Sequence, residues 1–181
     1  MADASVRPAV PADAAEIARI QAACWQRSYA GLLPEEALAA VGSTDAAQTW
    51  RDAVASPPSD RHRVLTALAG EVVVGFAALS PAGDPDLVPR LDAELHALCV
   101  DPARTGAGHG SRLVNASADV LRSAGFDHVH VWVTEREADL RSFLERAGWA
   151  DDGARRSLDL RGDGEVLVDQ VRLRTTISEP A

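Results

Sequence analysis

The sequence predicts an α/β (α+β) fold in which one mixed sheet carries helices on both of its faces. The order of strand-like and helix-like segments, β-α-α-β-β-β-α-β-α-β-β, is the first observation that supports this class. The second is an alternating strand at 94–100 that passes through a glycine-rich turn directly into helical apolar spacing. The third is that no repeat or linker divides the chain, so we expect residues 1–181 to form one domain.

The first half of the chain contains clear helix boundaries and one hairpin. Asp13 and Glu16 have the spacing of a capping box, and Gly31 and Pro34 break the helix that follows. Gly70 lies in the turn between two β-rich segments, which indicates a hairpin. In order, the predicted elements are a strand at 5–8, a helix from the Asp13 cap to the break at Gly31, helices at 35–41 and 44–54, and strands at 63–69 and 71–79.

The second half begins with a proline-rich acidic loop and ends with a second hairpin. Thr134 and Glu137 form another capping pattern, and Gly148 ends the helix after it. The last strand changes its alternation at Asp169-Gln170, which predicts a bulge there. In order, the predicted elements are a loop at 81–92, strands at 94–100 and 128–133 with a helix between them, a helix from 135, and a hairpin around 161–164.

The glycine-rich turn between strand and helix is a predicted anion site. Asp101 and Pro102 end the strand, and three glycines follow within the segment RTGAGHG at 104–110. Glycine permits positive φ and a close approach of the backbone, while a helix start offers unpaired N–H groups and a positive dipole end. These properties suit a phosphate, and most naturally a pyrophosphate.

Two well-known phosphate loops fit this turn poorly. The nucleoside-triphosphate loop requires a lysine, and the chain contains none. The dinucleotide fingerprint requires GxGxxG and an acidic residue after the next strand, whereas here the spacing is GxGxG and Asp127 precedes that strand. The dinucleotide interpretation stays open as the weaker alternative.

The turn resembles that of the GNAT superfamily of N-acetyltransferases. Val100, Pro102, Gly108 and Gly110 fall on the family's pattern, and FLERAGW at 143–149 is similar to its FYE-x-x-G-[FW] segment. The resemblance implies a mostly antiparallel twisted sheet of about seven strands. It also implies acetyl-CoA as co-substrate and direct attack by a primary amine, of a small molecule or a peptide N-terminus, in a ternary complex. A non-catalytic acyl-CoA-binding sensor or interaction module of the same fold is the alternative.

By this resemblance, the turn and helix start bind the coenzyme A pyrophosphate. The expected binding residues are Arg104, Thr105, Gly106, Ala107, Gly108, His109, Gly110 and Ser111. Thr105 departs from the family, which has Arg or Gln at that position, and Arg104 is available one residue earlier to supply charge. We expect His109 to be a partly exposed spacer within the turn.

The central strand is expected to hold the thioester and the base. By resemblance, the backbone at Leu98, Cys99 and Val100 binds the pantetheine arm and orients the carbonyl. Period-two alternation places Glu94 and His96 on the same face as Leu98 and Val100, opposite Leu95, Ala97 and Cys99. An alkylammonium has a pKa near ~10.4, so the amine must lose a proton, and Glu94 and His96 are the candidate bases. The alternative is that Glu94 is a solvent-exposed strand residue and His96 is packed.

The general acid is where the resemblance weakens. Many family members have a tyrosine in the segment that here carries Leu144, and the only tyrosine of the chain is Tyr29, in the segment that borders the acceptor pocket of relatives. A thiolate of pKa near ~8.5 can leave without a strong acid, so the loss does not exclude transfer.

The composition limits the classes of partner that we expect the protein to bind. A net charge of −9 argues against nucleic acid and favours cationic partners, and we expect Asp84, Asp86 and Asp92 to attract a cationic amine to the cleft. No apolar run reaches membrane-spanning length, and the N-terminus lacks an apolar signal core, so we expect a cytoplasmic protein without membrane partners. Cys24 and Cys99 are expected to be buried thiols, with no metal site, and a homodimer is left open.

Overall fold

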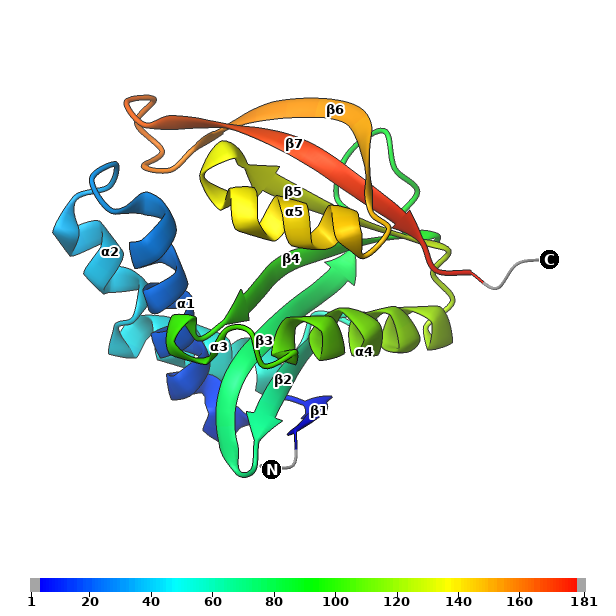
Figure 1. The fold of residues 1–181 in the computed structure, drawn as a ribbon, viewed down its shortest axis with the longest axis horizontal. Helices are drawn as coiled ribbons and strands as arrows, with labels where there is room; N and C mark the ends of the chain where they lie inside the picture. The colour runs from blue at the N-terminus through cyan, green and yellow to red at the C-terminus, as the bar shows by residue number, and fades with distance from the viewer. Residues whose placement is uncertain (1–3, 179–181) are drawn as a thin grey trace.

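The computed structural model describes residues 4–178, so the ends of the predicted domain, 1–3 and 179–181, lie outside the described residues. Seven strands form one sheet in the order β1-β2-β3-β4-β5-β7-β6 (Figure 1). Neighbouring strands are antiparallel throughout, except that β4 and β5 are parallel. The predicted class, a mixed and mostly antiparallel sheet with helices, is confirmed.

The strands agree with the predicted segments to within two residues at most boundaries. Their bounds are β1 Ala4–Pro8, β2 Arg63–Ala69, β3 Val72–Pro81, β4 Asp92–Val100, β5 His128–Thr134, β6 Ala150–Asp159 and β7 Leu167–Thr176. The two strands on either side of the parallel pairing, β4 and β5, lie in the middle of the sheet. A residue on either of them is therefore enclosed by strands on its flanks.

The helices begin at the capping residues that the sequence predicted, with one exception. Ser43 accepts a hydrogen bond from the backbone N–H of Ala46 at 3.2 Å, and Glu137 accepts one from that of Thr134 at 3.0 Å. Asp13 does not cap its helix, because its carboxylate is bound instead by the Arg7 guanidinium. The bounds are α1 Ala14–Tyr29, α2 Glu35–Val41, α3 Thr44–Ala55, α4 His109–Ser123 and α5 Ala138–Arg146, with single 3-10 turns at Pro11–Asp13, Pro102–Arg104 and Glu135–Glu137.

Two apolar layers cover the sheet. On one face, α4 and α5 contribute Leu113, Leu121 and Leu144 to the larger core cluster, all three fully buried. On the other face, Ile17 and Ile20 of α1 pack with Phe76 of β3, and Trp50 of α3 joins them. Because both faces are covered, the central strands can carry apolar residues on both sides, as the predicted fold requires.

A bulge in β4 overturns the predicted alternation along the central strand. β3 pairs Ala78 with Ala97 and Leu79 with Leu95, which leaves His96 as an extra residue without a partner. Leu95 and Leu98 consequently both pack against the larger core cluster, although three positions separate them. Glu94 therefore belongs to the face of Ala97 and Cys99, and its predicted placement with Leu98 and Val100 is wrong.

The bulge predicted at Asp169-Gln170 is also wrong. β7 keeps an unbroken register with β5, and the irregularity lies opposite it, in β6 between Asp151 and Arg155. There the Asp151 carboxylate accepts a hydrogen bond from the backbone N–H of Gly153, and the Asp152 carboxylate accepts one from that of Ala154. Gly153 itself has φ of 91°. These are Asx turns, which take three residues of β6 out of the ladder.

Two features are absent from the residues that the structure describes: a membrane-spanning helix and a metal-binding cluster. Between residues 4 and 178, no helix combines the length and the apolar character that crossing a bilayer requires. In the same part of the chain, no three His, Cys, Asp or Glu side chains converge as a metal ion would need.

Candidate active site

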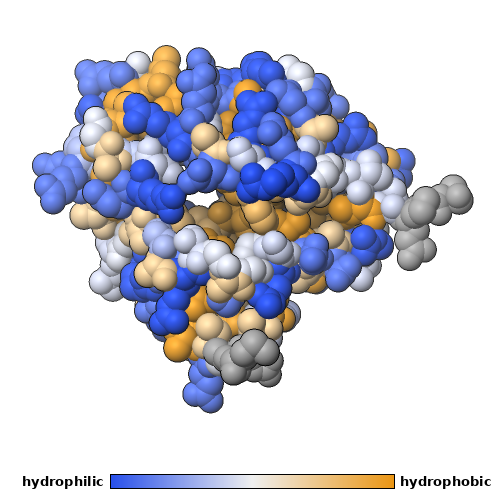
Figure 2. Space-filling view, viewed as in Figure 1, coloured by the Kyte–Doolittle hydropathy of each residue, from blue (hydrophilic) through white to orange (hydrophobic). Residues whose placement is uncertain are grey.

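A cleft opens where β4 and β5 part. The two strands pair only through Asp92–Glu94 and His128–His130, and beyond that point they diverge. The cleft has a volume of about 790 Å³, and residues 95–100 of β4 form one wall while Val131 and Trp132 of β5 form another. Figure 2 shows the molecule hollowed here, between α5 and the start of α4. The unpaired backbone of β4 is thus open to a ligand.

The glycine-rich turn lies at one end of this cleft. Gly106 and Gly108 have φ of 81° and 80°, and Gly108 is the residue immediately before α4. The first N–H groups of α4 lack partners within the helix, so they are available to an anion. The predicted co-substrate residues that line the cleft are Leu98, Cys99, Val100, Thr105, Gly106, Gly108, His109, Gly110 and Ser111. Arg104 and Ala107 do not line it.

Arg112 is a residue of the turn that the sequence interpretation missed. Its Nη1 donates to the carbonyl oxygen of Ala107 at 2.9 Å and lies 3.0 Å from the position that a Cβ on Gly108 would take. A residue with a side chain at position 108 would therefore be strained by the positive φ, and its side chain would crowd the Arg112 guanidinium. The signal available in the sequence was the arginine one helical turn after Gly108, on the side of the helix start.

His109 is not the partly exposed spacer that was expected. Only 6% of the residue is exposed, and within residues 4–178 its Nδ1 is buried without a hydrogen-bond partner. Burial lowers the pKa of the imidazole, and the charges of Arg112 and Arg104 lower it further. A neutral imidazole therefore lies at the base of the turn, and the positive charge in this region belongs to the two arginines.

The bulge brings Glu94 and His96 into contact with Ser80 of β3. His96 Nδ1 lies 3.2 Å from Glu94 Oε1, and His96 Nε2 lies 2.6 Å from Ser80 Oγ. The His96 side chain is 49% exposed and lines the cleft, whereas Glu94 has 12% exposure and does not line it. The two candidate bases are therefore joined, with the imidazole in front and the carboxylate behind it.

The number of hydrogens on Ser80 and His96 decides which of these contacts can be hydrogen bonds at the same time. Ser80 Oγ also donates to the Pro81 carbonyl oxygen at 2.9 Å, and a hydroxyl has one hydrogen. With that hydrogen committed, His96 must supply a hydrogen to Ser80 from Nε2 and another to Glu94 from Nδ1. All three contacts are hydrogen bonds at once only when both ring nitrogens carry hydrogen, so uptake of a proton completes the set.

Aromatic and charged side chains of α1, β5 and α5 form the rest of the cleft. Trp25 and Trp132 both line it, as do Glu137 and Asp139. Burial raises the pKa of Glu137, against the hydrogen bonds from the Thr134 backbone and hydroxyl. At the rim, Arg27 Nη2 donates to Asp139 Oδ2 at 2.9 Å and so joins α1 to α5.

The position where the resemblance implies a general acid is occupied by Leu144 in this chain. Leu144 is fully buried in the larger core cluster and offers no proton. Tyr29 packs edge-to-face against Trp25 with ring centroids 5.3 Å apart, but it does not line the cleft. Burial, with the nearby Glu137 charge, raises the pKa of Tyr29 to about 12, so the phenol keeps its hydrogen at neutral pH.

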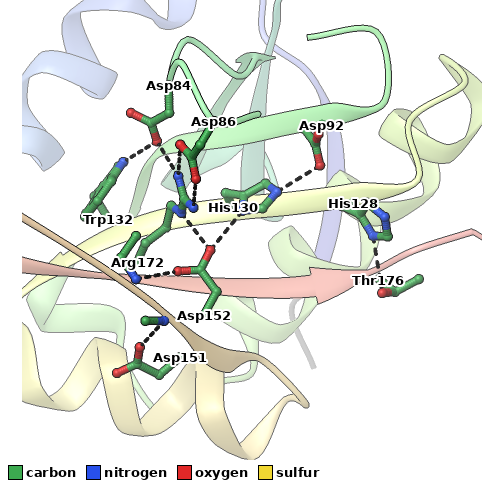
Figure 3. A network of polar contacts seen from close by, with 12 residues as sticks. Asp84, Asp86, Asp92, His128, His130, Trp132, Asp151, Asp152, Arg172 and Thr176 are labelled. Carbon is green, nitrogen blue, oxygen red and sulfur yellow. Dashed lines mark hydrogen bonds and ion pairs between the residues drawn. The ribbon is translucent and has the colours of Figure 1, made fainter. Parts of the chain in front are cut away.

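The three aspartates expected to attract a cationic acceptor are engaged elsewhere. Asp84 and Asp86 are hydrogen-bonded to the buried Arg172 guanidinium, whose Nε also donates to Asp152 (Figure 3). Asp92 accepts from the backbone N–H of Val88 and contacts His130. None of the three lines the cleft. Hydrogen bonds from Arg172 lower the pKa of Asp86 to about 2, and the predicted place of the three carboxylates at the mouth of the cleft is wrong.

Comparison with known proteins agrees with the fold. Residues 16–149 match the Acetyltransferase (GNAT) family, which covers most of the chain. The chain belongs to this family of acyltransferases.

Two curated relatives are mycothiol acetyltransferases. The chain is 34% identical over 157 residues to that of Rhodococcus jostii, covering 82% of this chain and 47% of the relative. It is 38% identical over 56 residues to that of Beutenbergia cavernae, covering 31% of this chain and 19% of the relative. The chain thus spans at most about half the length of these relatives.

Solved structures share the fold at lower sequence identity. The N-acetyltransferase PaiA of Thermoplasma acidophilum, in complex with coenzyme A, has a TM-score of 0.75 at 17% identity, covering 96% of this chain and 99% of that one. YncA of Salmonella typhimurium, solved with its cofactor acetyl-CoA, has a TM-score of 0.72 at 21% identity, covering 99% and 96%. The predicted family and fold are both confirmed.

Proposed function

We propose that the protein transfers the acetyl group of acetyl-CoA to a primary amine, by direct attack in a ternary complex. The observation that carries this proposal is the cleft between β4 and β5, which runs from the glycine-rich turn to His96. A single continuous space thus joins a predicted pyrophosphate site to a candidate base. Structures of similar fold have been solved with coenzyme A or acetyl-CoA, which supports the choice of co-substrate.

The turn and β4 would hold the co-substrate in two parts. The N–H groups at the start of α4, with Arg112 beside them, suit the pyrophosphate. Along Leu98, Cys99 and Val100, β4 pairs with β3 on one side and has no strand partner on the side of β5, and this open side suits the amide groups of the pantetheine arm, because these form the same hydrogen bonds as a neighbouring strand. The same backbone N–H groups would stabilise the oxyanion that develops on the thioester carbonyl.

His96 would accept the proton of the attacking amine at Nε2, which would exchange its contact with Ser80 for the amine or for an intervening water molecule, while Glu94 holds Nδ1. The protonated imidazole would then donate from Nε2 to Ser80 and from Nδ1 to Glu94. The amine nitrogen then bonds to the carbonyl carbon as the carbon–sulfur bond breaks, the sulfur leaves as thiolate, and the second proton of the nitrogen passes to that thiolate or to water. No acid at Leu144 is required, since a thiolate leaves readily.

The acceptor is best sought among primary amines that tolerate an aromatic-walled cleft. Trp25 and Trp132 offer ring faces and Glu137 offers a carboxylate to an ammonium group, whereas Asp139 is engaged by Arg27. The similarity to mycothiol acetyltransferases adds amines related to mycothiol to the panel. These cleft residues replace the three aspartates as the source of any preference for cationic amines.

The test is the release of free thiol from acetyl-CoA in the presence of an amine panel, with mass spectrometry of the products. We expect at least one primary amine to gain an acetyl group at a rate proportional to enzyme concentration. Binding of acetyl-CoA without transfer to any amine would favour the alternative, an acyl-CoA-binding module, for which the buried Leu144 is the specific observation. Absence of both binding and transfer would contradict the proposal altogether.

A further inference from the structure

Two cysteine thiols that the proposed reaction does not use border the same cleft. Cys24 is on α1 and Cys99 is on β4, and both line the cleft and pack against the same apolar cluster. The Cys24 Sγ lies 3.4 Å from the carbonyl oxygen of Val100, the residue next to Cys99. Both thiols are free and partly exposed, so the expectation that they are simply buried does not hold.

We propose that Cys24 and Cys99 form a redox-active thiol pair, which small disulfides entering the cleft oxidise to an internal disulfide. Two thiols from distant parts of the chain, in one solvent-connected space, are the arrangement that such a reaction needs. The class of ligand is a low-molecular-weight disulfide, because a cleft of about 790 Å³ admits a small molecule rather than a protein chain.

The two thiols differ in reactivity. A hydrogen bond from Cys99 lowers the pKa of the Cys24 thiol, while the same contact and burial raise that of Cys99. Since the thiolate is the nucleophile in disulfide exchange, these directions favour Cys24 as the attacking group and Cys99 as the resolving group.

The exchange proceeds in two balanced steps. The Cys24 thiolate attacks one sulfur of the small disulfide, which forms a mixed disulfide and releases one small thiolate. Cys99 then loses its proton and attacks the Cys24 sulfur, which forms the internal disulfide and releases the second small thiolate. Overall, the two protein thiols are oxidised and one small disulfide is reduced to two thiols.

The internal disulfide would tie α1 to the segment of β4 proposed to bind the pantetheine arm. This consequence rests on the proposed function, whereas formation of the bond does not. We expect oxidation to weaken acetyl-CoA binding by about tenfold or more, a change that calorimetry resolves easily. Treatment with a dithiol reductant should restore the affinity.

The test is mass spectrometry of the full chain after incubation with oxidised glutathione, followed by peptide mapping. We expect the wild-type protein to lose two hydrogen atoms and to carry no lasting adduct. Cys99→Ser should keep one glutathione on Cys24, because the resolving thiol is gone. Cys24→Ser should react far more slowly, because its remaining thiol has the raised pKa.

Three outcomes would overturn the proposal. They are a wild-type protein that keeps both thiols free, a wild-type protein that keeps a mixed disulfide without the internal bond, and a Cys24→Ser variant that reacts as fast as Cys99→Ser. The wild-type result needs no variant, so misfolding of a variant cannot hide it. Since the mapping involves no acetyl-CoA, failure here is distinct from failure of the proposed function.

Discussion

His96 is the residue on which the proposed chemistry depends most. It is the bulged residue of β4, lines the cleft, and is held between Glu94 and Ser80. A bulge next to a site re-aims a side chain, and here it turns an imidazole toward the cleft while the carboxylate stays behind it. Glu94 and Ser80 are thus positioning residues for a base.

We expect His96→Gln to lower kcat/KM by about 10²- to 10⁴-fold, the usual contribution of a general base. The rise of kcat/KM with pH should flatten in the same variant, since the group that must be deprotonated is gone. The measurement is the pH–rate profile with the best amine. His128→Gln is the matched control, because His128 lies on β5, contacts Thr176 and does not line the cleft.

Glu94→Gln should give a smaller loss than His96→Gln, because glutamine can still accept the Nδ1 hydrogen. A Glu94→Gln variant with the larger loss would reassign the base to Glu94 itself. Equal activity of His96→Gln and wild type over the whole pH range would exclude both side chains from proton transfer.

At the scale of elements, one ion pair joins α1 to the entrance of the turn. Arg19 Nη2 lies 2.7 Å from Asp101 Oδ2, and hydrogen bonds from Arg19 and then the Ala103 N–H lower the pKa of Asp101. The stabilisation is present above the unfolded pKa of ~3.9 and is lost as the pH falls through the lower folded value.

We expect Asp101→Asn to remove this part of the acid dependence of the unfolding free energy. The effect should be at most about 1 kcal/mol, because the Arg19 side chain is 49% exposed and solvent screens the pair. Urea unfolding of both proteins at several pH values between neutral and strongly acidic conditions measures it. If the wild-type and variant free energies fall in parallel with pH, the pair does not join these elements. Asp119→Asn, in an exposed pair within α4, serves as control.

A second set of contacts ties the 82–91 loop to the far strands of the sheet. Arg172 of β7 is 5% exposed and pairs with Asp84 and Asp86 of the loop and Asp152 of β6. Removal of this guanidinium would leave the Asp84 and Asp152 carboxylates, which are 18% and 15% exposed, without their cation, and this is the costly way to break such a network.

We expect Arg172→Met to lower the unfolding free energy by about 3 to 5 kcal/mol, with a fall in Tm on the order of 10 °C. Arg174→Met is the matched control, since Arg174 is exposed on the same strand. Thermal unfolding followed by circular dichroism compares them. A variant at Arg172 no less stable than the one at Arg174 would show that the network does not hold the loop.

Helix boundaries were predictable because the residues that set them are close in sequence. Gly31, Pro34 and Ser43 act on their own segments, and α2 and α3 begin where these residues indicate. The β4 bulge was not predictable, since it depends on how β3 pairs with β4, and the alternation rule assumes an unbroken ladder.

The candidate site also has a part that depends on local sequence, which was predictable, and a part that depends on long-range contacts, which was not. The turn at Gly106 and Gly108 is local, and glycine at positive φ leaves a clear pattern in the sequence. Ser80 reaches His96 only through strand pairing, and Arg172 reaches Asp86 across the whole second half of the chain. The acidic loop was therefore interpreted as free charge, when its partner was an arginine far away in sequence.

At the scale of the molecule, the central claim is that acetyl-CoA enters the cleft by way of the turn before α4. The most direct measurement is calorimetric titration of acetyl-CoA into the wild type, Gly108→Asp and Gly70→Asp. Gly70 also has positive φ, but it lies in an open turn between β2 and β3, so its variant carries the same backbone strain and charge away from the cleft. We predict that Gly70→Asp binds like the wild type while Gly108→Asp loses measurable affinity, since its carboxylate would pair with the Arg112 guanidinium and add a negative charge beside the proposed pyrophosphate site. A folded Gly108→Asp that binds acetyl-CoA as tightly as the wild type would contradict the account.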